Sequence, residues 1–402
     1  MIFDYLDCRT IVMKLGLVSD QIHEIVKSYN RLKINFSTLS NSYWQSLSQS
    51  IQPENIIAIS LSNDYSFVDE LIDQLNFLLS SFKFNEFIRL KSLKLDGLNG
   101  TDMDRLFKHI PKHSLKSLSI TLSDRKVNNI HGIIDICSST ILPYGLGHID
   151  LNLSKSALPN IDVLQPIKHV LQSLAINDCT YEEYHRILSS SVNLRTFLIQ
   201  NYTGEKNFST TLSTLVESNY PRLKSLTINS RSLIFEQVCS MLSLTPSLVH
   251  LQINLQDLKN DCILNGTDWE EFLQNKLIHL NNFQFYFACD AEMIDRRRSL
   301  SSIIEPFKTT FWLKEKRWIV LCDFILRTSE MILYTLSSPV NHRENAIRCR
   351  ALSLNDQYHI IKGRRANHSN DLSSEKVIKI DNDMRHIFNE IAFCTIFRVV
   401  LY

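Results

Sequence analysis

The sequence contains no run of about 18 consecutive apolar residues, the length that a helix needs to cross a bilayer. Its first residues also lack the basic start, apolar stretch and small-residue cleavage site of a secretory signal peptide. We therefore expect no membrane span and no membrane partner. The expected location is cytoplasmic, nuclear or both.

An excess of one charge is also missing, because 43 Lys and Arg residues stand against 42 Asp and Glu residues. This balance provides no global field that would attract a polyanion, so we expect no nucleic-acid partner. The nine cysteines stand singly, with no C-x-x-C pair, which argues against a disulfide framework and against a zinc site. Glycine and proline, nine of each in 402 residues, are scarce, which limits tight turns.

The usual signatures of catalysis are absent as well. The sequence has no Walker A loop, no G-x-G-x-x-G, no G-x-S-x-G and no H-E-x-x-H motif. Its 13 histidines form no cluster at the spacing of metal ligands. We therefore expect a protein that is not an enzyme, with no catalytic residue, no metal and no cofactor.

What the sequence does contain is a repeated apolar pattern. The stretch RLKSLTIN at 222–229 places apolar residues in the order L-x-x-L-x-I, and the same spacing occurs nine times. The first positions of successive repeats are between 23 residues (Leu171 to Leu194) and 34 residues (Ile56 to Leu90) apart. The repeats begin at Ile56, Leu90, Leu115, Leu146, Leu171, Leu194, Leu223, Leu248 and Leu280. A period of this size dictates the architecture of a chain.

A helical period follows several of these strand-like segments. It is clearest over residues 68–79, 103–110 and 235–242, where apolar residues recur at spacings of three and four and share one helix face. One short strand and one helix cannot bury their apolar faces alone, so neighbouring units must stack. The pattern therefore predicts an α/β fold, an irregular leucine-rich-repeat solenoid over residues 56–290, with parallel strands on its concave face and helices outside.

Side chains that alternate with the apolar positions of each strand should point to the concave face. Most of them are polar and uncharged, which favours hydrogen bonding to a protein segment, although each one could simply be a solvated strand position. The predicted partner-binding residues are Lys94, Asp96, His148, Asp150, Asn152, Asn177, Gln200, Asn229, His250, Gln252 and Asn254.

The first 36 residues begin with MIFDYL, continue through a turn at Asp7 and then show an amphipathic period that ends before Tyr29. This segment resembles the F-box, a small helical module that docks on the adaptor subunit of cullin-RING ubiquitin ligases. The opening Leu-Pro-x-Glu of that family is absent, so the resemblance is to an F-box truncated at its N-terminus. It implies that Ile2, Phe3, Tyr5 and Leu6 bind the adaptor. The alternative is a helical cap that closes the apolar end of the repeat array.

The remaining segments complete the predicted domain organisation. Residues 37–55 are polar and indicate a connector, and residues 291–402 form a C-terminal capping or extension region. Within that region the aromatic block at 307–326 is expected to cap the last repeat, residues 317–324 are expected to form a strand, and residues 341–375 are expected to be loops.

Taken together, these patterns predict a non-enzymatic scaffold. An F-box before leucine-rich repeats implies the substrate-recognition adaptor of a cullin-RING ubiquitin ligase, with a ligase adaptor subunit and an unknown target protein as its partners. Such a protein acts by proximity and orientation, since other subunits perform the chemistry. The alternative is a stand-alone leucine-rich-repeat scaffold that has no contact with a ubiquitin ligase.

Overall fold

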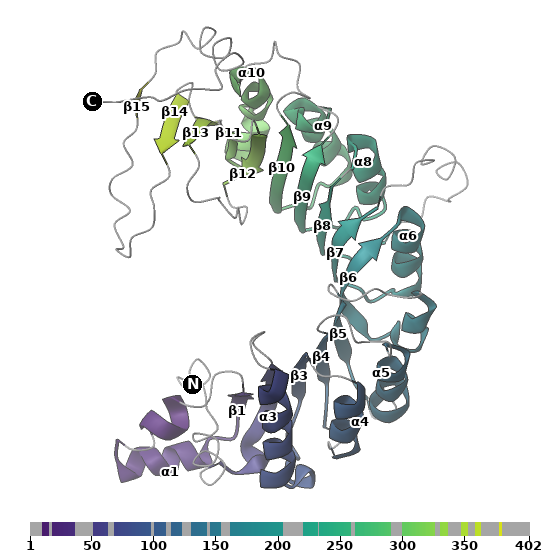
Figure 1. The fold of residues 1–402 in the computed structure, drawn as a ribbon, viewed down its shortest axis with the longest axis vertical. Helices are drawn as coiled ribbons and strands as arrows, with labels where there is room; N and C mark the ends of the chain where they lie inside the picture. The colour runs from purple at the N-terminus through teal and green to yellow at the C-terminus, as the bar shows by residue number, and fades with distance from the viewer. Residues whose placement is uncertain are drawn as a thin grey trace. The chain divides into compact units, whose positions relative to one another are not determined.

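A computed structural model of the chain forms two compact units, residues 1–228 and 229–402, and each mixes helices and strands (Figure 1). The structure describes residues 10–15, 18–36, 51–62, 68–97, 100–109, 114–122, 130–142, 145–153, 161–203, 220–231, 233–258, 262–290, 300–325, 330–336, 347–352, 358–362 and 378–379. Within these ranges, no helix is long and apolar enough to cross a membrane.

The N-terminal unit is built on parallel strands that pair in chain order, each with the next. They are β1 (Leu32–Asn35), β2 (Ile56–Ser62), β3 (Ser92–Asp96), β4 (Ser117–Thr121), β5 (His148–Leu153), β6 (Leu171–Cys179), β7 (Thr196–Tyr202) and β8 (Ser225–Ser230). The boundary between the units falls inside β8. The predicted mostly parallel α/β arrangement is confirmed.

Helices connect the strands of this unit. The α-helices are α1 (Asp20–Ser28), α3 (Val68–Ser81), α4 (Gly100–His109), α5 (Ile130–Ile136) and α6 (Tyr181–Ser190). Shorter turns are η2 (Thr10–Leu15), η4 (Pro53–Asn55), η5 (Phe84–Glu86), η6 (Cys137–Ile141) and η8 (Ile161–Ile167). Helices α3, α4, α5 and α6 lie on the same side of the sheet (Figure 1).

Alternating burial explains why the repeated segments form strands. Every apolar position of the nine L-x-x-L-x-I patterns is buried, with at most 5% of its surface exposed, while the residues between them are half-buried or exposed. A strand that is apolar on one face gains its stability by packing that face against the helices. The strands predicted from the nine patterns and the helices predicted at 68–79 and 235–242 are confirmed, and α4 confirms the helix predicted at 103–110 as far as His109. The strand predicted at 317–324 begins later, at Val320.

A backbone hydrogen-bond ladder repeats from strand to strand. In most units the carbonyl oxygen of the residue after the first apolar position accepts a hydrogen bond from the next unit. Lys91 O accepts from the N–H groups of Lys116 and Ser117, at 2.9 Å each, and Arg195 O accepts from those of Lys224 and Ser225. Side chains at these positions have no part in the ladder, which therefore tolerates different residue types.

The ladder shifts between β5 and β6. Elsewhere equivalent positions of the pattern lie side by side, as Leu93 and Leu118 do. Leu151 and Ile176 are the third apolar positions of their repeats, but Leu151 pairs with Leu174. The register is therefore offset by two residues here. Because strand side chains alternate with a period of two, an even offset leaves every side chain on its original face.

The C-terminal unit continues with parallel pairing and then changes direction. Strands β9 (His250–Leu258) and β10 (Asn282–Asp290) are parallel, whereas β12 (Glu330–Thr335) is antiparallel to β10. The order continues through β11 (Val320–Ile325), β13 (Ile347–Leu352), β14 (Tyr358–Lys362) and β15 (Ile378–Lys379), all antiparallel. The helical elements are α8 (Phe235–Ser243), η9 (Cys262–Leu264), α9 (Gly266–Lys276), α10 (Leu300–Ile304), η11 (Glu305–Phe307) and η12 (Phe311–Glu315).

Aromatic side chains fill the helix-side core of this unit. Trp269 of α9 is fully buried and stacks on Phe287, with ring centroids 6.0 Å apart, and its Nε1 donates to Ile263 O at 2.8 Å. Trp312 packs edge-on against Phe307 at 4.9 Å. Such rings bury large areas and prefer tilted or offset contacts, so they fix the packing of η11 and η12 on β10.

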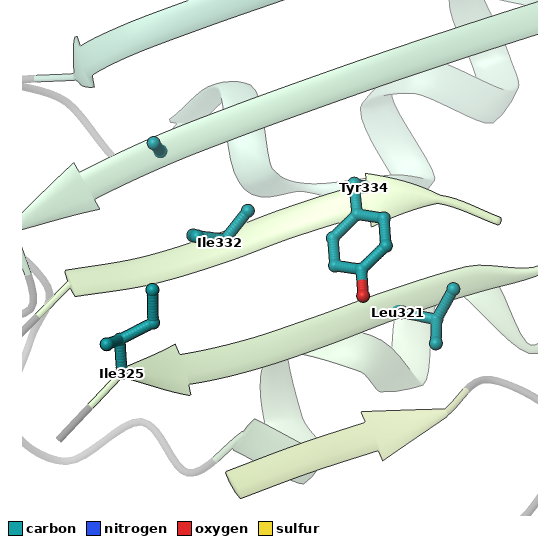
Figure 2. Packing of buried hydrophobic residues seen from close by; sticks show 5 residues of the cluster. Leu321, Ile325, Ile332 and Tyr334 are labelled. Carbon is teal, nitrogen blue, oxygen red and sulfur yellow. The ribbon is translucent and has the colours of Figure 1, made fainter. Parts of the chain in front are cut away.

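On the opposite face of the same strands, a smaller apolar cluster is buried. It consists of Ala288, Leu321, Ile325, Ile332 and Tyr334, with Tyr286 packed against it. Figure 2 shows the labelled side chains on one face of β11 and β12, with helices behind the sheet. Strands β11 and β12 are therefore apolar on both faces, unlike the repeated strands.

One sequence expectation was incomplete and one was wrong. The helix expected to end before Tyr29 is α1, which ends at Ser28, but the segment 1–36 also contains a strand. Leu32–Asn35 form β1, because Leu32 and Ile34 alternate with exposed Lys33 and Asn35 and pair with β2. Residues 341–375 were expected to be loops, yet β13 and β14 lie within them. Their polar composition does not indicate strands. The two strands gain stability by antiparallel pairing, β13 with β11 and β14 with β13.

Candidate binding face of the sheet

The predicted binding residues lie on the side of the strands that faces away from the helices, and we call this surface the polar face. In the N-terminal unit it includes Lys94, Asp96, His148, Asp150, Asn152, Asn177 and Gln200. In the C-terminal unit it includes Asn229, His250, Gln252 and Asn254. Lys94, Gln200 and His250 are exposed, and the other eight are half-buried. None of them is withdrawn into the core.

Strand register aligns these residues in rows within the N-terminal unit. One row runs through Ser60, Lys94, Ser119, Asp150, Ser173, Thr196 and Ser225. The next runs through Ser62, Asp96, Thr121, Asn152, Ala175, Leu198 and Thr227. Adjacent strands lie about 4.8 Å apart, so the first row offers a hydroxyl or a charged group at every strand step, whereas Ala175 and Leu198 interrupt the second row.

The first row contains Asp150, a charged residue whose pKa is shifted. Partial burial raises the pKa of its carboxyl group, and the nearby His148 opposes this effect and lowers the pKa. The two residues are two positions apart on β5 and share one face. A carboxylate that is poorly solvated gains more from a new hydrogen-bond donor than a fully hydrated one does, so Asp150 suits the recognition of a donor group.

A polar network that the sequence analysis missed lies at the end of β6. Asp178 accepts hydrogen bonds from Nδ2 of Asn177 at 2.8 Å and from Nδ2 of Asn201 at 2.7 Å. Alternation along the strand would turn Asp178 toward the core, but it is exposed because the alternation breaks between Asn177 and the buried Cys179. In the sequence this break appears as the polar Asp178 followed by the apolar Cys179, the reverse of the alternation before it.

In the C-terminal unit, the polar face is held by side-chain amides. Nδ2 of Asn254 donates to Oδ1 of Asn229 at 2.6 Å. Register then places His250 beside Asn282, Gln252 beside Gln284 and Asn254 beside Tyr286. These three residues of β10 were not among the predicted sites, although the same alternation that identified the others applies to them.

The polar face offers hydrogen-bond donors and acceptors and has no reactive centre of the usual kinds. Among the described residues, no group of three or more His, Cys, Asp or Glu side chains could hold a metal ion. Burial raises the pKa of the Cys137 and Cys239 thiols to about 12, so neither is an activated nucleophile. This surface is suited to binding.

No family model matches the chain, and no curated protein is significantly similar to it. The predicted adaptor-binding residues Ile2, Phe3, Tyr5 and Leu6 lie outside the described residues. In the neighbouring described segment, α1 buries Val26 and is followed by the buried Tyr29, while Val18 and Ile25 are exposed.

Proposed function

We propose that the chain is a leucine-rich-repeat protein that binds a target protein through its polar face and acts as the substrate-recognition adaptor of an F-box type cullin-RING ubiquitin ligase. The observation that carries the first half is the combination of buried apolar positions in all nine patterns with in-register polar rows on the opposite side. In a leucine-rich-repeat array this side is the concave binding surface. The ligase role rests on the resemblance of residues 1–36 to a truncated F-box.

The polar rows favour a protein segment as the ligand. Serine, threonine, asparagine and glutamine side chains can form hydrogen bonds with peptide groups and polar side chains, and their desolvation cost is modest. Each such hydrogen bond contributes a net stabilisation of about 1 kcal/mol. A surface of this kind gains affinity through many such contacts and through the exclusion of water around them. The absence of a recognisable catalytic motif fits a role in which other subunits supply the chemistry.

The second candidate function is a stand-alone repeat scaffold with no ligase adaptor. One observation favours it: Leu32–Asn35 form a strand that adds to β2, so the N-terminal segment takes part in the sheet as an end cap would. Capping units are a physical requirement of stacked repeats, because the terminal apolar face must be covered. The polar face would then serve the same kind of target in a different assembly.

Co-expression with the cullin-RING adaptor subunit, followed by size-exclusion chromatography, separates the two candidates. The ligase role predicts that the wild-type chain co-elutes with the adaptor and that a variant with Phe3→Asp and Leu6→Asp does not. The reason is that burying a carboxylate in the interface without a partner costs at least about 2 kcal/mol of binding free energy. A matched variant with Gln21→Asp and Asn30→Asp adds two carboxylates at exposed positions, with the same change in net charge, and should still co-elute. Failure of the wild type to co-elute would remove the ligase role and leave the scaffold.

A further inference from the structure

The turns that lead into strands β3 to β8 carry many basic side chains and no acidic ones. The described turn and strand-start residues are 88–92, 114–117, 145–148, 167–173, 192–196 and 220–225. They contain Arg89, Lys91, Lys116, Lys168, Arg195, Arg222 and Lys224, and no Asp or Glu. We call this row of side chains the basic edge. It belongs entirely to the N-terminal unit.

Two pairs of like charges occupy neighbouring strands on this edge. Lys91 and Lys116 hold equivalent positions before β3 and β4, and the backbone N–H of Lys116 donates to Lys91 O at 2.9 Å. Arg195 and Lys224 are arranged in the same way before β7 and β8, at 2.8 Å. Because neighbouring strands are about 4.8 Å apart, each pair concentrates two positive charges within a short distance.

The contacts of three of these cations do not neutralise them. Lys116 Nζ donates to the carbonyl of Gly145 at 3.4 Å, Lys168 Nζ to Gln165 Oε1 at 2.9 Å, and Arg222 to Asn193, and all three acceptors are uncharged. Lys91 and Arg195 are exposed and make no ion pair with the described acidic residues. The positive charges of Lys91 and Arg195, one in each pair, therefore face solvent.

Folding does not require basic residues at these positions. The ladder uses only the backbone of the residue in question, and Gly147 and Gln172 hold the same position before β5 and within β6. Like charges on neighbouring strands are mildly destabilising. Their occurrence in two separate pairs points to a role outside folding.

We propose that the basic edge binds an acidic segment of a partner protein, with carboxylates at Lys91 and Lys116 and a second group at Arg195 and Lys224. From β4 to β7 is three strand steps, so the two pairs are roughly 14 Å apart. An extended peptide covers this distance in about four residues. The ligand is then a segment with two acidic clusters at about that spacing.

A protein segment fits this edge better than a nucleic acid does. Single-stranded nucleic acids bind through aromatic side chains on which the bases stack. Tyr220 is the one Phe, Trp or Tyr residue among the described residues of the basic edge, and its hydroxyl group and ring contact His185. This binding needs neither the ligase adaptor nor the polar face, so it goes beyond the proposed function.

Fluorescence anisotropy with the full chain tests the proposal. The probe is a fluorescein-labelled peptide with two Glu-Glu pairs four residues apart, and its control is the same peptide with glutamine in place of glutamate. We expect the glutamate peptide to bind, the glutamine peptide not to bind, and affinity to fall as salt rises from 50 to 200 mM. Equal binding of the two peptides, or binding of neither, would overturn the proposal.

Paired charge reversals place the site. A variant with Lys91→Glu and Arg195→Glu removes one cation from each pair and should bind the glutamate peptide at least tenfold more weakly. The control, Lys14→Glu with Lys276→Glu, makes the same change in net charge at exposed positions elsewhere and should bind within twofold of the wild type. An equal loss in both variants would show that only net charge matters, and the proposal would be wrong.

Two further measurements test whether the charge-reversed variant is folded and whether the ligand is a nucleic acid. If the charge-reversed chain does not keep the wild-type circular dichroism, the variant with Lys91→Gln and Arg195→Gln takes its place, with an expected loss of at least fivefold. A fluorescein-labelled oligothymidine is measured beside the peptide. Tighter binding of the oligonucleotide, lost with the same substitutions, would assign the basic edge to single-stranded nucleic acid and would refute a protein ligand.

Discussion

The hydroxyl group of Tyr334 donates a hydrogen bond to Oδ2 of Asp323, at 3.1 Å, and both side chains are buried. Asp323 is fully buried on β11, a strand whose every residue is buried, so its carboxylate depends on protein partners in place of water. Antiparallel register places Arg350 of β13 directly opposite Asp323. The hydrogen bond between Tyr334 and Asp323 lies beside the apolar cluster of Figure 2 and orients Tyr334 within that cluster.

Removal of that hydroxyl should therefore destabilise the C-terminal unit. We expect Tyr334→Phe to lower the free energy of unfolding by about 2 kcal/mol, because it leaves a buried carboxylate short of a donor. Ile332→Val, in the same cluster, is the control and should cost about 1 kcal/mol through lost packing alone. Urea unfolding monitored by circular dichroism gives both values. A smaller loss for Tyr334→Phe than for Ile332→Val would show that the hydrogen bond contributes little.

Gly266, at the first position of α9, should not tolerate a side chain. A Cβ atom built there would lie 2.9 Å from the backbone carbon of Pro306 and 2.9 Å from the ring of Phe307, closer than such contacts allow. We expect Gly266→Ala to destabilise the fold by about 1 to 3 kcal/mol through overpacking. Thr267→Ala, one position along on the exposed surface, should change stability by less than about 0.5 kcal/mol. Equal thermal midpoints for the two variants would contradict the close packing of α9 on η11.

The raised pKa of Asp150 predicts how stability changes with pH. Because the folded protein holds this proton more tightly than the unfolded chain does, stability falls as pH rises from 3.8, the unfolded value, through the folded pKa. Asp150→Asn removes this contribution. At neutral pH we expect the variant to be more stable than the wild type by less than about 1 kcal/mol, since the group is only half-buried and solvent screens it.

Urea unfolding of both chains across pH 3 to 8 checks this expectation. The difference in unfolding free energy between Asp150→Asn and the wild type should grow as pH rises through that window and then stay constant. His148→Gln is the matched variant, because His148 lowers the pKa of Asp150 and its loss should widen the window. A difference that grows toward acid pH would reverse the sign and refute the assignment.

Three of the described thiols, those of Cys137, Cys179 and Cys239, should be unreactive in the folded protein. Burial raises the pKa of Cys137 and Cys239 to about 12 and raises that of Cys179 as well. At pH 8 we expect Cys137 and Cys239 to react with iodoacetamide on the order of a thousandfold more slowly in the folded protein than in urea, because only the thiolate is nucleophilic. Cys179 should also react more slowly in the folded protein, for the same reason. Mass spectrometry of peptides from timed reactions gives each rate. Rapid labelling of Cys179 in the folded protein would contradict its burial.

The sequence predicted the repeated strands well because a single physical feature determines them. An apolar pattern such as Leu223, Leu226 and Ile228 has one buried face and therefore one stable orientation, and the polar face follows from alternation. The register offset at β5 and β6 could not be predicted, because a shift of two residues leaves every side chain in an equivalent environment. The pattern is satisfied either way.

Other features escaped prediction for different reasons. Asp178 contributes to the polar face only because the alternation breaks at the end of β6, and a prediction from regular alternation places this residue in the core. Strand β13, with arginines at 348 and 350, lacks the apolar run that marks a strand, and its antiparallel pairing with β11 stabilises it. Tertiary pairing outweighs local composition at such places.

The change from parallel to antiparallel pairing at β10 bears on how such a chain can evolve. Each strand from β2 to β7 presents a parallel edge that accepts another strand of its own kind, so a strand and its helix could be duplicated or lost there without a new type of join. The contact between β10 and β12 differs from these parallel contacts, because the two strands are antiparallel. It also includes a hydrogen bond from the backbone N–H of Phe285 to the hydroxyl oxygen of Thr335, at 3.1 Å. Gain and loss of units should therefore be confined to the region before β10, with the closing hairpin inherited as one piece.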